Sequence, residues 1–320
     1  MLLEITKSNE VSGIVTHNVD GTTIGDNPCL PVIIGEVFGW EAIQINFITE
    51  NGVSISIGAC RKGTKIVMLP QFSYGPSVNH LIAVELLLAL KKHGFECQWR
   101  SNIKISEFAF TDKTTTFLPL QANADLQFQQ FSSNLRRKIR KCTANKIGFK
   151  TGKSELIADF YRVYSRNMHR LGSPAQPLKW FSSLIEKYRN GEALICCAYL
   201  GEKVVGAAFM LEYQGFYEAC WVSTIGKYNK LYVSYGLYWE MMRFAIEHDG
   251  TQFSFGRSTI GSGVHKFKLQ WGGIDMQLFW NYSHPQGQNI RKFSFLPKLW
   301  KLMPYKVAKH LGPVVSGWFY

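Results

Sequence analysis

The stretch that decides the fold is Phe253-Ser-Phe-Gly-Arg-Ser258, then Gly261-Ser-Gly263, then Phe267-Lys-Leu-Gln-Trp-Gly-Gly273. Its alternating aromatic residues predict a strand, its glycines predict a loop, and the residues around Phe267 predict a short helix. The expected ranges are 252–255 for the strand, 256–263 for the loop, 265–270 for the helix and 276–282 for a last strand.

Three strands and a long helix are predicted immediately before this stretch. Runs rich in β-branched, aromatic and apolar residues predict a meander at 193–200, 204–213 and 215–224, and a helix at 231–248. The resulting order is β-β-β-α-β-α-β. It recurs less clearly in the first part of the chain, where Asn51-Gly52 predicts a hairpin turn and Asn79 can cap a helix at 81–93.

A basic helix is predicted in the middle of the chain. Apolar residues follow residue 125 at spacings of three and four and predict one helical stripe: Phe128, Phe131, Leu135, Ile139 and Cys142. Arg136, Arg137 and Arg140 lie mostly off this stripe and are expected in solvent. A plain solvated face is the default interpretation of such charges, and the alternative is contact with the phosphates of a substrate, a nucleic acid or a membrane.

The runs quoted first resemble the C-terminal signature of FemAB-like transferases, which belong to the GNAT acyltransferase superfamily. The similarity continues in Asn134-Leu-Arg-Arg-Lys-Ile-Arg140, Met168-His-Arg-Leu-Gly-Ser-Pro174 and Tyr228-Asn-Lys-Leu-Tyr232. It is closest to FemAB-related proteins that accompany bacterial exosortase and exopolysaccharide systems. It covers about 131–282, touches 300–313, and is weak in the first 120 residues, where Leu69-Pro70 to Tyr74-Gly75 is the main similarity.

This resemblance implies an α/β (α+β) fold of two tandem GNAT-like domains, each a mixed, largely antiparallel sheet flanked by helices. The expected divisions are an N-terminal domain at 1–123, a transferase domain at 124–285 and a basic amphipathic segment at 286–320. The implied activity is transfer of an acyl or aminoacyl group from a thioester or ester donor to an amine.

Lys268 is the catalytic residue that the resemblance implies, because Fem enzymes carry a lysine in the same Phe-Lys-x-x-aromatic-Gly run. Such a cation would stabilise an oxyanion or a phosphate-bearing substrate. By spacing alone, Lys268 would be a solvated helix residue that contributes little to stability. Phe267 and Trp271 are expected to pack the short helix. Ser254 occupies a position where relatives usually carry Asp, so a carboxylate is missing there.

Other candidate residues each have two interpretations. Arg257 and Ser258 can meet a phosphate beside the glycines, or Arg257 can pair with Asp249. Glu218 can be a general base or a surface carboxylate. His169 can bind substrate or simply suit the C-terminal end of its helix.

Tyr228 and Asn229 are expected where GNAT proteins hold the donor, before the long helix. The segment Ile225-Gly-Lys-Tyr-Asn-Lys-Leu231 has a single glycine, whereas acetyl-CoA enzymes have a glycine-rich pyrophosphate loop there. Tight acetyl-CoA binding is therefore disfavoured. A carrier-bound acyl group or aminoacyl-tRNA becomes the better donor, although the helical hairpin with which some Fem ligases engage transfer RNA is not visible in the sequence.

The charge of the chain is concentrated in its second part. Residues 1–130 hold 9 Lys/Arg against 12 Asp/Glu, whereas residues 131–320 hold 27 against 11. The stretches 131–153 and 287–320 contain no acidic residue. The tail from 293 to 320 interleaves Trp300, Leu302, Leu311 and Trp318 with lysines, which is typical of a membrane-surface segment; its three prolines favour instead an irregular strap on the domain.

Composition excludes a disordered or fibrous chain. With 46% apolar and 14% aromatic residues the chain can bury a large core. No apolar run reaches the length of a membrane helix, and no signal peptide is seen at residues 1–10, so we expect a cytosolic protein, peripheral at the inner membrane face. Seven cysteines without a C-x-x-C pair predict reduced thiols, and the eight histidines predict no metal site.

We therefore expect an N-acyl or aminoacyl transferase that modifies an amino group of a cell-envelope or exopolysaccharide precursor. It would hold no cofactor tightly, use acyl-CoA or aminoacyl-tRNA as donor, and act on an anionic, lipid-linked acceptor. The alternative is a non-enzymatic basic module that binds nucleic acid or an exopolysaccharide assembly. An open cleft shared by Lys268 and Arg257 would favour the enzyme, and burial or dispersal of the two would favour the module.

Overall fold

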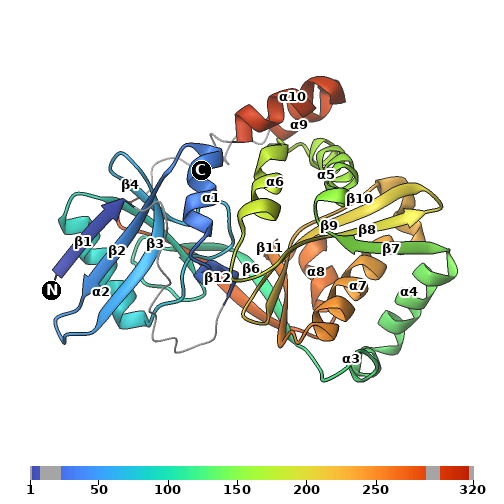
Figure 1. Cartoon of the computed structure of the whole chain (residues 1–320), viewed down its shortest axis with the longest axis horizontal. Helices are drawn as coiled ribbons and strands as arrows, with labels where there is room; N and C mark the ends of the chain where they lie inside the picture. The colour runs from blue at the N-terminus through green and yellow to red at the C-terminus, as the bar shows by residue number, and fades with distance from the viewer. Residues whose placement is uncertain (1, 8–22, 286–295, 317–320) are drawn as a thin grey trace.

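The computed structural model describes residues 2–7, 23–285 and 296–316, which contain one sheet of twelve strands in the order β1-β2-β3-β4-β5-β12-β6-β11-β10-β9-β8-β7 (Figure 1). The strands are β1 Leu2–Lys7, β2 Glu41–Ile48, β3 Ser54–Lys62, β4 Lys65–Met68, β5 Glu96–Ser101, β6 Phe110–Pro119, β7 Ile147–Gly152, β8 Ala193–Leu200, β9 Lys203–Tyr213, β10 Phe216–Thr224, β11 Gln252–Thr259 and β12 Ile274–Tyr282. The α-helices are α1 Leu30–Phe38, α2 His80–Lys92, α3 Ala124–Gln130, α4 Ser133–Ala144, α5 Ile157–Leu171, α6 Leu178–Lys187, α7 Val233–Glu247, α8 Gly263–Leu269, α9 Leu296–Leu302 and α10 Tyr305–Ser316. Short 3-10 helices are η1 Ile24–Asp26, η2 Ser154–Leu156 and η3 Gly226–Leu231.

Two strands join the N-terminal and C-terminal halves of the sheet. β6 comes before α3 in the chain and pairs with both β11 and β12. β12, the last strand, pairs with β5 of the N-terminal half. Therefore β5 of the N-terminal half pairs with β12 of the C-terminal half, and β11 of the C-terminal half pairs with β6 of the N-terminal half. The division expected at residue 123 falls between β6 and α3, and one continuous sheet contains strands from both sides of it.

Three apolar cores hold the helices on the sheet. One core runs across both halves and includes Trp40, Phe72, Phe160, Trp180 and Trp280. The second packs α4 and α7 on β8 to β11, and the third packs α2 on β2 to β5. Figure 1 shows α1, α5 and α6 above the sheet and α2, α4, α7 and α8 below it. Because the first core spans both halves, it fixes the loop after β4 against the C-terminal half.

The sequence pattern predicted most elements with small shifts in their ends. Two predictions were wrong. The helical stripe after residue 125 is divided into α3 and α4, because Phe131 is extended and the Ser132 hydroxyl caps α4 by accepting the Leu135 amide at 3.3 Å. The strand expected to end at Phe255 continues to Thr259, since Arg257 to Thr259 regain pairing with β6 after an irregularity. β1 was not predicted.

The C-terminal segment forms two helices, α9 and α10, and not the irregular strap that its prolines suggested. They lie on the outer side of α5 (Figure 1). His169 of α5 hydrogen-bonds the Met303 carbonyl at 2.8 Å, and the Tyr305 hydroxyl lies 2.9 Å from that of Ser165. Trp318, named with this segment, lies outside the described residues.

Candidate active site

The site lies where β10 and β11 separate. These two strands pair in parallel only from Phe216 to Glu218, opposite Gln252 to Ser254. Just beyond this point β10 shifts its register against β9, and β11 shifts its register against β6. Register shifts of this kind bend strands and change where side chains point. The gap between the diverging strands is filled by polar side chains.

Glu218 is buried at the last paired position. It is 2% exposed and its Oε2 atom accepts hydrogen bonds from the hydroxyls of Tyr74 and, at 3.0 Å, Ser254. The Ser254 hydroxyl also lies 3.3 Å from that of Thr115 on β6. Burial raises the pKa of Glu218, and the hydrogen bonds from Tyr74 and Ser254 oppose that effect. A raised pKa makes a carboxylate a stronger proton acceptor.

Ser254, which stands where the family resemblance leads one to expect Asp, lies directly opposite Glu218 in the parallel ladder. The neighbouring strand supplies a carboxylate at the position where this strand lacks one. The surface-carboxylate interpretation of Glu218 is excluded by its burial.

Lys268 approaches the same gap from α8. Its Nζ atom donates to the carbonyls of Gly256 at 2.7 Å and Arg257 at 3.1 Å, and the side chain is 3% exposed. Burial lowers the pKa of Lys268 to about 7, with Glu218 opposing and the Arg257 charge adding to the decrease. The solvated lysine that spacing alone predicted is therefore wrong. Nor do Lys268 and Arg257 share an open cleft, since Lys268 is enclosed and Arg257 is only partly buried.

Gly256 makes this approach of Lys268 feasible. Its φ is +67°, and a Cβ atom there would lie 2.8 Å from the Ala219 carbonyl oxygen. Both the left-handed backbone and the close approach of β10 require glycine at this position. The irregular backbone turns two consecutive carbonyls toward the ammonium group.

Arg257 and Ser258 are not brought to one point. They pair with Thr115 and Thr114 respectively, so their side chains alternate between the two faces of the sheet. The Arg257 guanidinium stacks over the Trp280 ring at 5.9 Å, and its predicted pairing with Asp249 is not among the ion pairs of the described residues. Ser258 is 4% exposed, and its hydroxyl has no hydrogen-bond partner within the described ranges.

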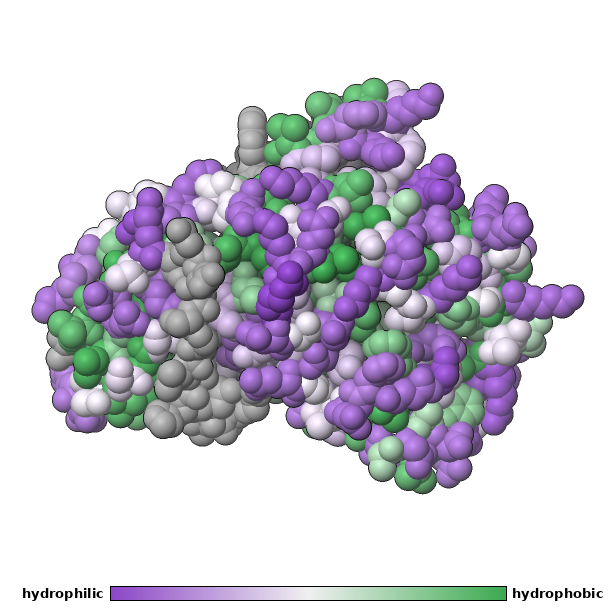
Figure 2. All heavy atoms as spheres, viewed as in Figure 1, coloured by the Kyte–Doolittle hydropathy of each residue, from purple (hydrophilic) through white to green (hydrophobic). Residues whose placement is uncertain are grey.

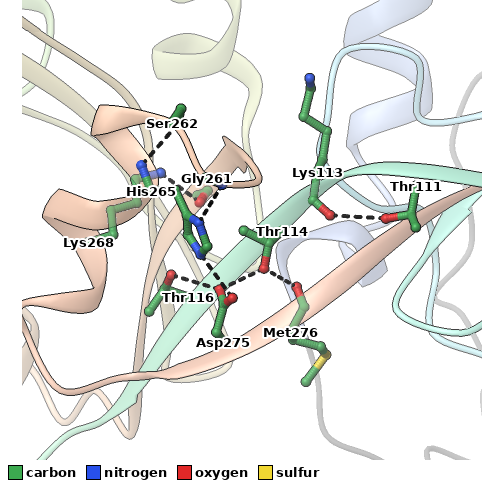
Figure 3. Close-up of polar contacts among 11 residues, drawn as sticks. Thr111, Lys113, Thr114, Thr116, Gly261, Ser262, His265, Lys268, Asp275 and Met276 are labelled. Atoms are coloured by element: carbon green, nitrogen blue, oxygen red, sulfur yellow. Dashed lines mark hydrogen bonds and ion pairs between the residues drawn. The ribbon is translucent and has the colours of Figure 1, made fainter.

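A histidine and an aspartate anchor α8 to the sheet (Figure 3). His265 Nε2 lies 2.9 Å from Asp275 Oδ2, and His265 Nδ1 accepts the Gly261 amide at 3.0 Å. Because Nδ1 accepts, the proton of a neutral ring is on Nε2 and is donated to Asp275. Thr114 of β6 donates to the other Asp275 oxygen at 2.6 Å. One turn later the same helix carries Lys268, so this pair sets the position of the ammonium group.

A cavity of about 320 Å³ adjoins the buried carboxylate. It lies beside the part of β12 that β5 does not pair, between α2, β6 and the start of β10 and β11. Phe216 and Gln252 line it, and they pair two positions before Glu218 and Ser254, so their side chains share a face of the sheet with that pair. Tyr74 and Thr115 belong both to its wall and to the hydrogen-bond group around Glu218.

The described lining of this cavity contains no Asp, Glu, Lys or Arg. Its polar members are neutral, and they alternate with Trp99, Phe117 and several aliphatic side chains. The Trp99 indole N–H is buried and has no hydrogen-bond partner within the described part of the chain. This chemistry suits an uncharged, hydroxyl- or amide-bearing ligand with an apolar face.

A second surface, which includes α4, is basic. We define the basic surface as Arg136, Arg137, Lys138, Arg140 and Lys141 of α4 together with Lys203 and Lys227. Lys138, Lys141, Lys203 and Lys227 lie 4.8–6.0 Å from the ring centres of Tyr235, Tyr232 or Tyr228. None of the seven cations forms a salt bridge in the described ranges. Lys138 Nζ donates to Gln270 at 2.7 Å, which connects this surface to the end of α8.

Tyr228 and Asn229 lie in η3 beside the basic surface. The Tyr228 and Tyr232 amides donate to the carbonyls of Ile225 and Asn229, and the Asn229 side chain accepts from Thr224 at 2.8 Å. Desolvation raises the pKa of Tyr228, but the hydrogen bonds and charges of Lys203 and Lys227 outweigh it, so the net effect is a lowered pKa. A 3-10 helix thus occupies the segment where a glycine-rich loop would present its amides.

His169, Arg136, Arg137 and Arg140 lie apart from Lys268. His169 contacts α9 and α10 through Met303 and Tyr305. Arg140 stacks over Phe128, while Arg136 donates to the Gln129 carbonyl and Arg137 to Asn134. In the described ranges no helix is both long and apolar enough to span a bilayer, and no three acidic, histidine or cysteine side chains gather as metal ligands.

Comparison with known proteins shows what the chain is similar to. Residues 129–269 match the Acetyltransferase (GNAT) domain family. The fold is similar to that of FemX, with 12% identity, a TM-score of 0.59, and coverage of 83% of this chain and 93% of that chain. The middle of the chain is thus similar to GNAT domains, and the fold as a whole is similar to that of FemX.

Two further structures share the fold of this chain. One is the C-terminal domain of a putative lysylphosphatidylglycerol synthetase from Agrobacterium fabrum, with 11% identity, a TM-score of 0.54, and coverage of 83% and 89% of the two chains. The other is L-PGS from Bacillus licheniformis, with 13% identity, a TM-score of 0.51, and coverage of 87% and 92%. A comparison with curated protein sequences gives no match. The match to the acetyltransferase domain favours a transferase over a non-enzymatic module, although Lys268 and Arg257 do not share the open cleft that was expected of the enzyme.

Some residues of this site were not found from the sequence. Tyr74 belonged to the weak similarity at Leu69 to Gly75, but no pattern connected it to Glu218, which is 144 positions later in the chain. His265 and Asp275 are separated by an irregular turn, so no helical or strand period relates them. Only the pairing of β6, β11 and β12 brings these residues together.

Proposed function

We propose that this FemAB-like enzyme transfers an aminoacyl group from transfer RNA to an amine of an envelope precursor. The observation that carries the proposal is the position of Glu218 and Lys268 at the separation of β10 and β11, between the uncharged cavity and the basic surface. One side of the pair suits a neutral acceptor, and the other side suits a polyanionic donor.

The donor is best placed on the basic surface. Seven cations without carboxylate partners attract phosphates, and the tyrosine faces beside them are platforms on which unpaired bases can stack. The basic surface reaches α8 through Lys138 and Gln270. An ester at the end of a nucleic acid held there would be close to the helix of Lys268. The closed η3 turn disfavours acetyl-CoA.

Lys268 and Glu218 have complementary roles in this reaction. As the amine attacks, the donor carbonyl gains negative charge, and the Lys268 ammonium stabilises that charge. The amine must also lose a proton, and Glu218 is the buried carboxylate that can accept it. Neither role involves a metal ion or a tightly bound cofactor.

The acceptor is best placed in the uncharged cavity. Neutral hydroxyl and amide groups beside Trp99 suit an amino sugar or a short peptide. Any phosphate of a lipid-linked acceptor would lie outside this cavity, because its described lining offers no cation. Arg257, partly exposed and within electrostatic reach of Lys268, is one candidate for that phosphate.

We also propose that α9 and α10 contact an anionic membrane. Leu299, Leu302, Leu311 and Val314 are 43–82% exposed, and the described residues of both helices include lysines but no acid. Figure 2 shows hydrophobic atoms at the outer edge formed by these helices. Their inner side contacts α5, and Gly312 packs against the backbone of Ala175 in the segment after α5, where a Cβ atom would have no room. Sedimentation with phosphatidylglycerol vesicles should decrease in Leu299→Asp/Leu302→Asp and not in Leu2→Asp, an exposed leucine of β1.

The function is tested by supplying both donors. Purified protein is incubated with a pool of radiolabelled aminoacyl-tRNA or with labelled acetyl-CoA, and with glucosamine or alanyl-lysine as acceptor. We expect label transfer from aminoacyl-tRNA, reduced by raising salt and by reversing charge at Arg136, Arg137 and Arg140. Transfer from acetyl-CoA alone would refute the proposed donor. Absence of transfer from both would refute the proposed function.

A further inference from the structure

We infer that Tyr74 is a catalytic residue that takes a proton from the acceptor amine and passes its own hydroxyl proton to Glu218. The inference rests on the proposed transfer reaction and adds a residue from the N-terminal half of the chain. Tyr74 belongs to the cavity wall and donates to Glu218 Oε2, so one side chain connects the place for the amine with the buried base.

Glu218 cannot reach the amine directly. It is 2% exposed, it does not line the cavity, and its Oε2 atom is already occupied by Tyr74 and Ser254. Of the two, only Tyr74 lines the cavity. The shortest route for a proton from the cavity to this carboxylate therefore passes through the phenol oxygen, since the route through Thr115 and Ser254 needs two hydroxyls and a longer 3.3 Å contact.

Tyr74 can relay a proton but is not suited to act as the final proton acceptor. Burial and the neighbouring Glu218 raise the pKa of Tyr74 well above its usual value, so the phenol remains protonated. As the amine nitrogen forms its bond to the acyl carbon, its N–H proton moves to the Tyr74 oxygen while the Tyr74 O–H proton moves to Glu218. The acyl–oxygen bond of the donor then breaks, and the leaving oxygen takes up a proton that Glu218 returns through Tyr74. Tyr74 and Glu218 both end unchanged, and no oxidant or reductant is needed.

The loop that carries Tyr74 is held from both sides. Arg100 donates to the carbonyls of Pro70 and Phe72 at 2.7 and 2.8 Å, and the Gly75 amide donates to the Arg100 carbonyl at 2.8 Å. Asp26 accepts the Ser77 amide at 2.7 Å on the other side. A Cβ atom at Gly75 would lie 2.6 Å from the Met68 Cβ. The phenol is therefore positioned before any substrate arrives, as proton transfer requires.

His80 is the competing group, because it is the other residue with a titratable ring that borders the described cavity. Its Nε2 lies 3.2 Å from the Lys104 carbonyl, and the ring is exposed. It has no described contact with Glu218. A direct role for His80 would make Tyr74 a packing residue only.

The test is a double-mutant cycle on label transfer from aminoacyl-tRNA to glucosamine. Tyr74→Phe and Glu218→Gln should each lower kcat by about 10²-fold or more with KM for glucosamine little changed, and the double variant should be no worse than either alone. Tyr161→Phe, which removes another buried phenol, should retain activity within about threefold. His80→Gln, at the edge of the cavity, should lower kcat much less than Tyr74→Phe does.

Three outcomes separate the possibilities. Additive losses in the double variant, or full activity in Tyr74→Phe, would overturn the relay while leaving the transferase intact. Loss of activity in His80→Gln with activity kept in Tyr74→Phe would assign the proton to His80. If wild-type protein transfers no label from either donor, the proposed function fails and the relay fails with it.

Discussion

The cavity and the basic surface differ in almost every property. The described wall of the cavity has neutral polar groups beside aromatic and aliphatic side chains, with no Lys, Arg, Asp or Glu. The basic surface has seven cations, several of them against tyrosine rings, and no salt bridge within the described ranges. This difference favours an uncharged ligand for the cavity and a polyanion for the basic surface. Lys268 and Glu218 stand where the two requirements meet.

The largest effect is expected at this meeting point. Lys268→Met should lower transfer by about 10²–10³-fold, as loss of one oxyanion-stabilising group typically does. The two carbonyls that lose their donor should cost about 1–3 kcal/mol of unfolding free energy, in contrast to the negligible cost expected for an exposed lysine. Transfer rates and chemical denaturation of the same variant measure both quantities. Transfer at the wild-type rate would remove Lys268 from the mechanism.

A substitution at the mouth of the cavity should affect acceptor binding and leave donor binding unchanged. Ile274 lines the cavity and is 61% exposed, so Ile274→Trp can fill the space without disturbing the core. We expect KM for glucosamine to rise by about tenfold or more, with donor KM unchanged, because a filled site mainly loses acceptor binding. Leu88→Trp, at an exposed helix position outside the cavity, is the matched control. A rise in donor KM alone would mean that the cavity belongs to the donor.

The charge state of Lys268 predicts a pH dependence. Activity requires the ammonium form, so kcat/KM should fall as pH rises through the pKa of Lys268, which burial lowers to about 7. The Arg257 charge contributes to that lowering. Arg257→Gln should therefore move the alkaline limb of the profile to higher pH. An unchanged limb in this variant would mean that a different group controls it.

The smallest effect is expected at the anchor of α8. Asp275→Asn keeps the shape of the side chain but removes the charged acceptor of the His265 proton. We expect kcat to fall about three- to tenfold with both KM values nearly unchanged, because Lys268 is displaced and not removed. Asp249→Asn, in an exposed turn, is the control. A loss as large as that of Lys268→Met would give Asp275 a direct role.

Local patterns in the sequence predicted most strands and helices, together with the cap at Asn79, because period and turn chemistry depend on neighbouring residues. They also drew attention to Lys268 and Glu218. The burial of Lys268 depends on the irregular backbone at Gly256, and the contact between Tyr74 and Glu218 depends on a sheet shared by both halves. The break between α3 and α4 was missed because the apolar stripe continues through Phe131, whereas Ser132 begins a new helix there. Such outcomes are decided by tertiary pairing, which a local pattern does not contain.

The most direct test of the account is equilibrium binding of two probes, glucosamine by NMR and deacylated transfer RNA by filter binding. The triple charge reversal at Arg136, Arg137 and Arg140 should weaken transfer RNA binding by at least about tenfold and leave glucosamine binding unchanged. Ile274→Trp should do the reverse. If glucosamine affinity follows the charge reversal, or transfer RNA affinity follows Ile274→Trp, the assignment of acceptor to the cavity and donor to the basic surface is contradicted.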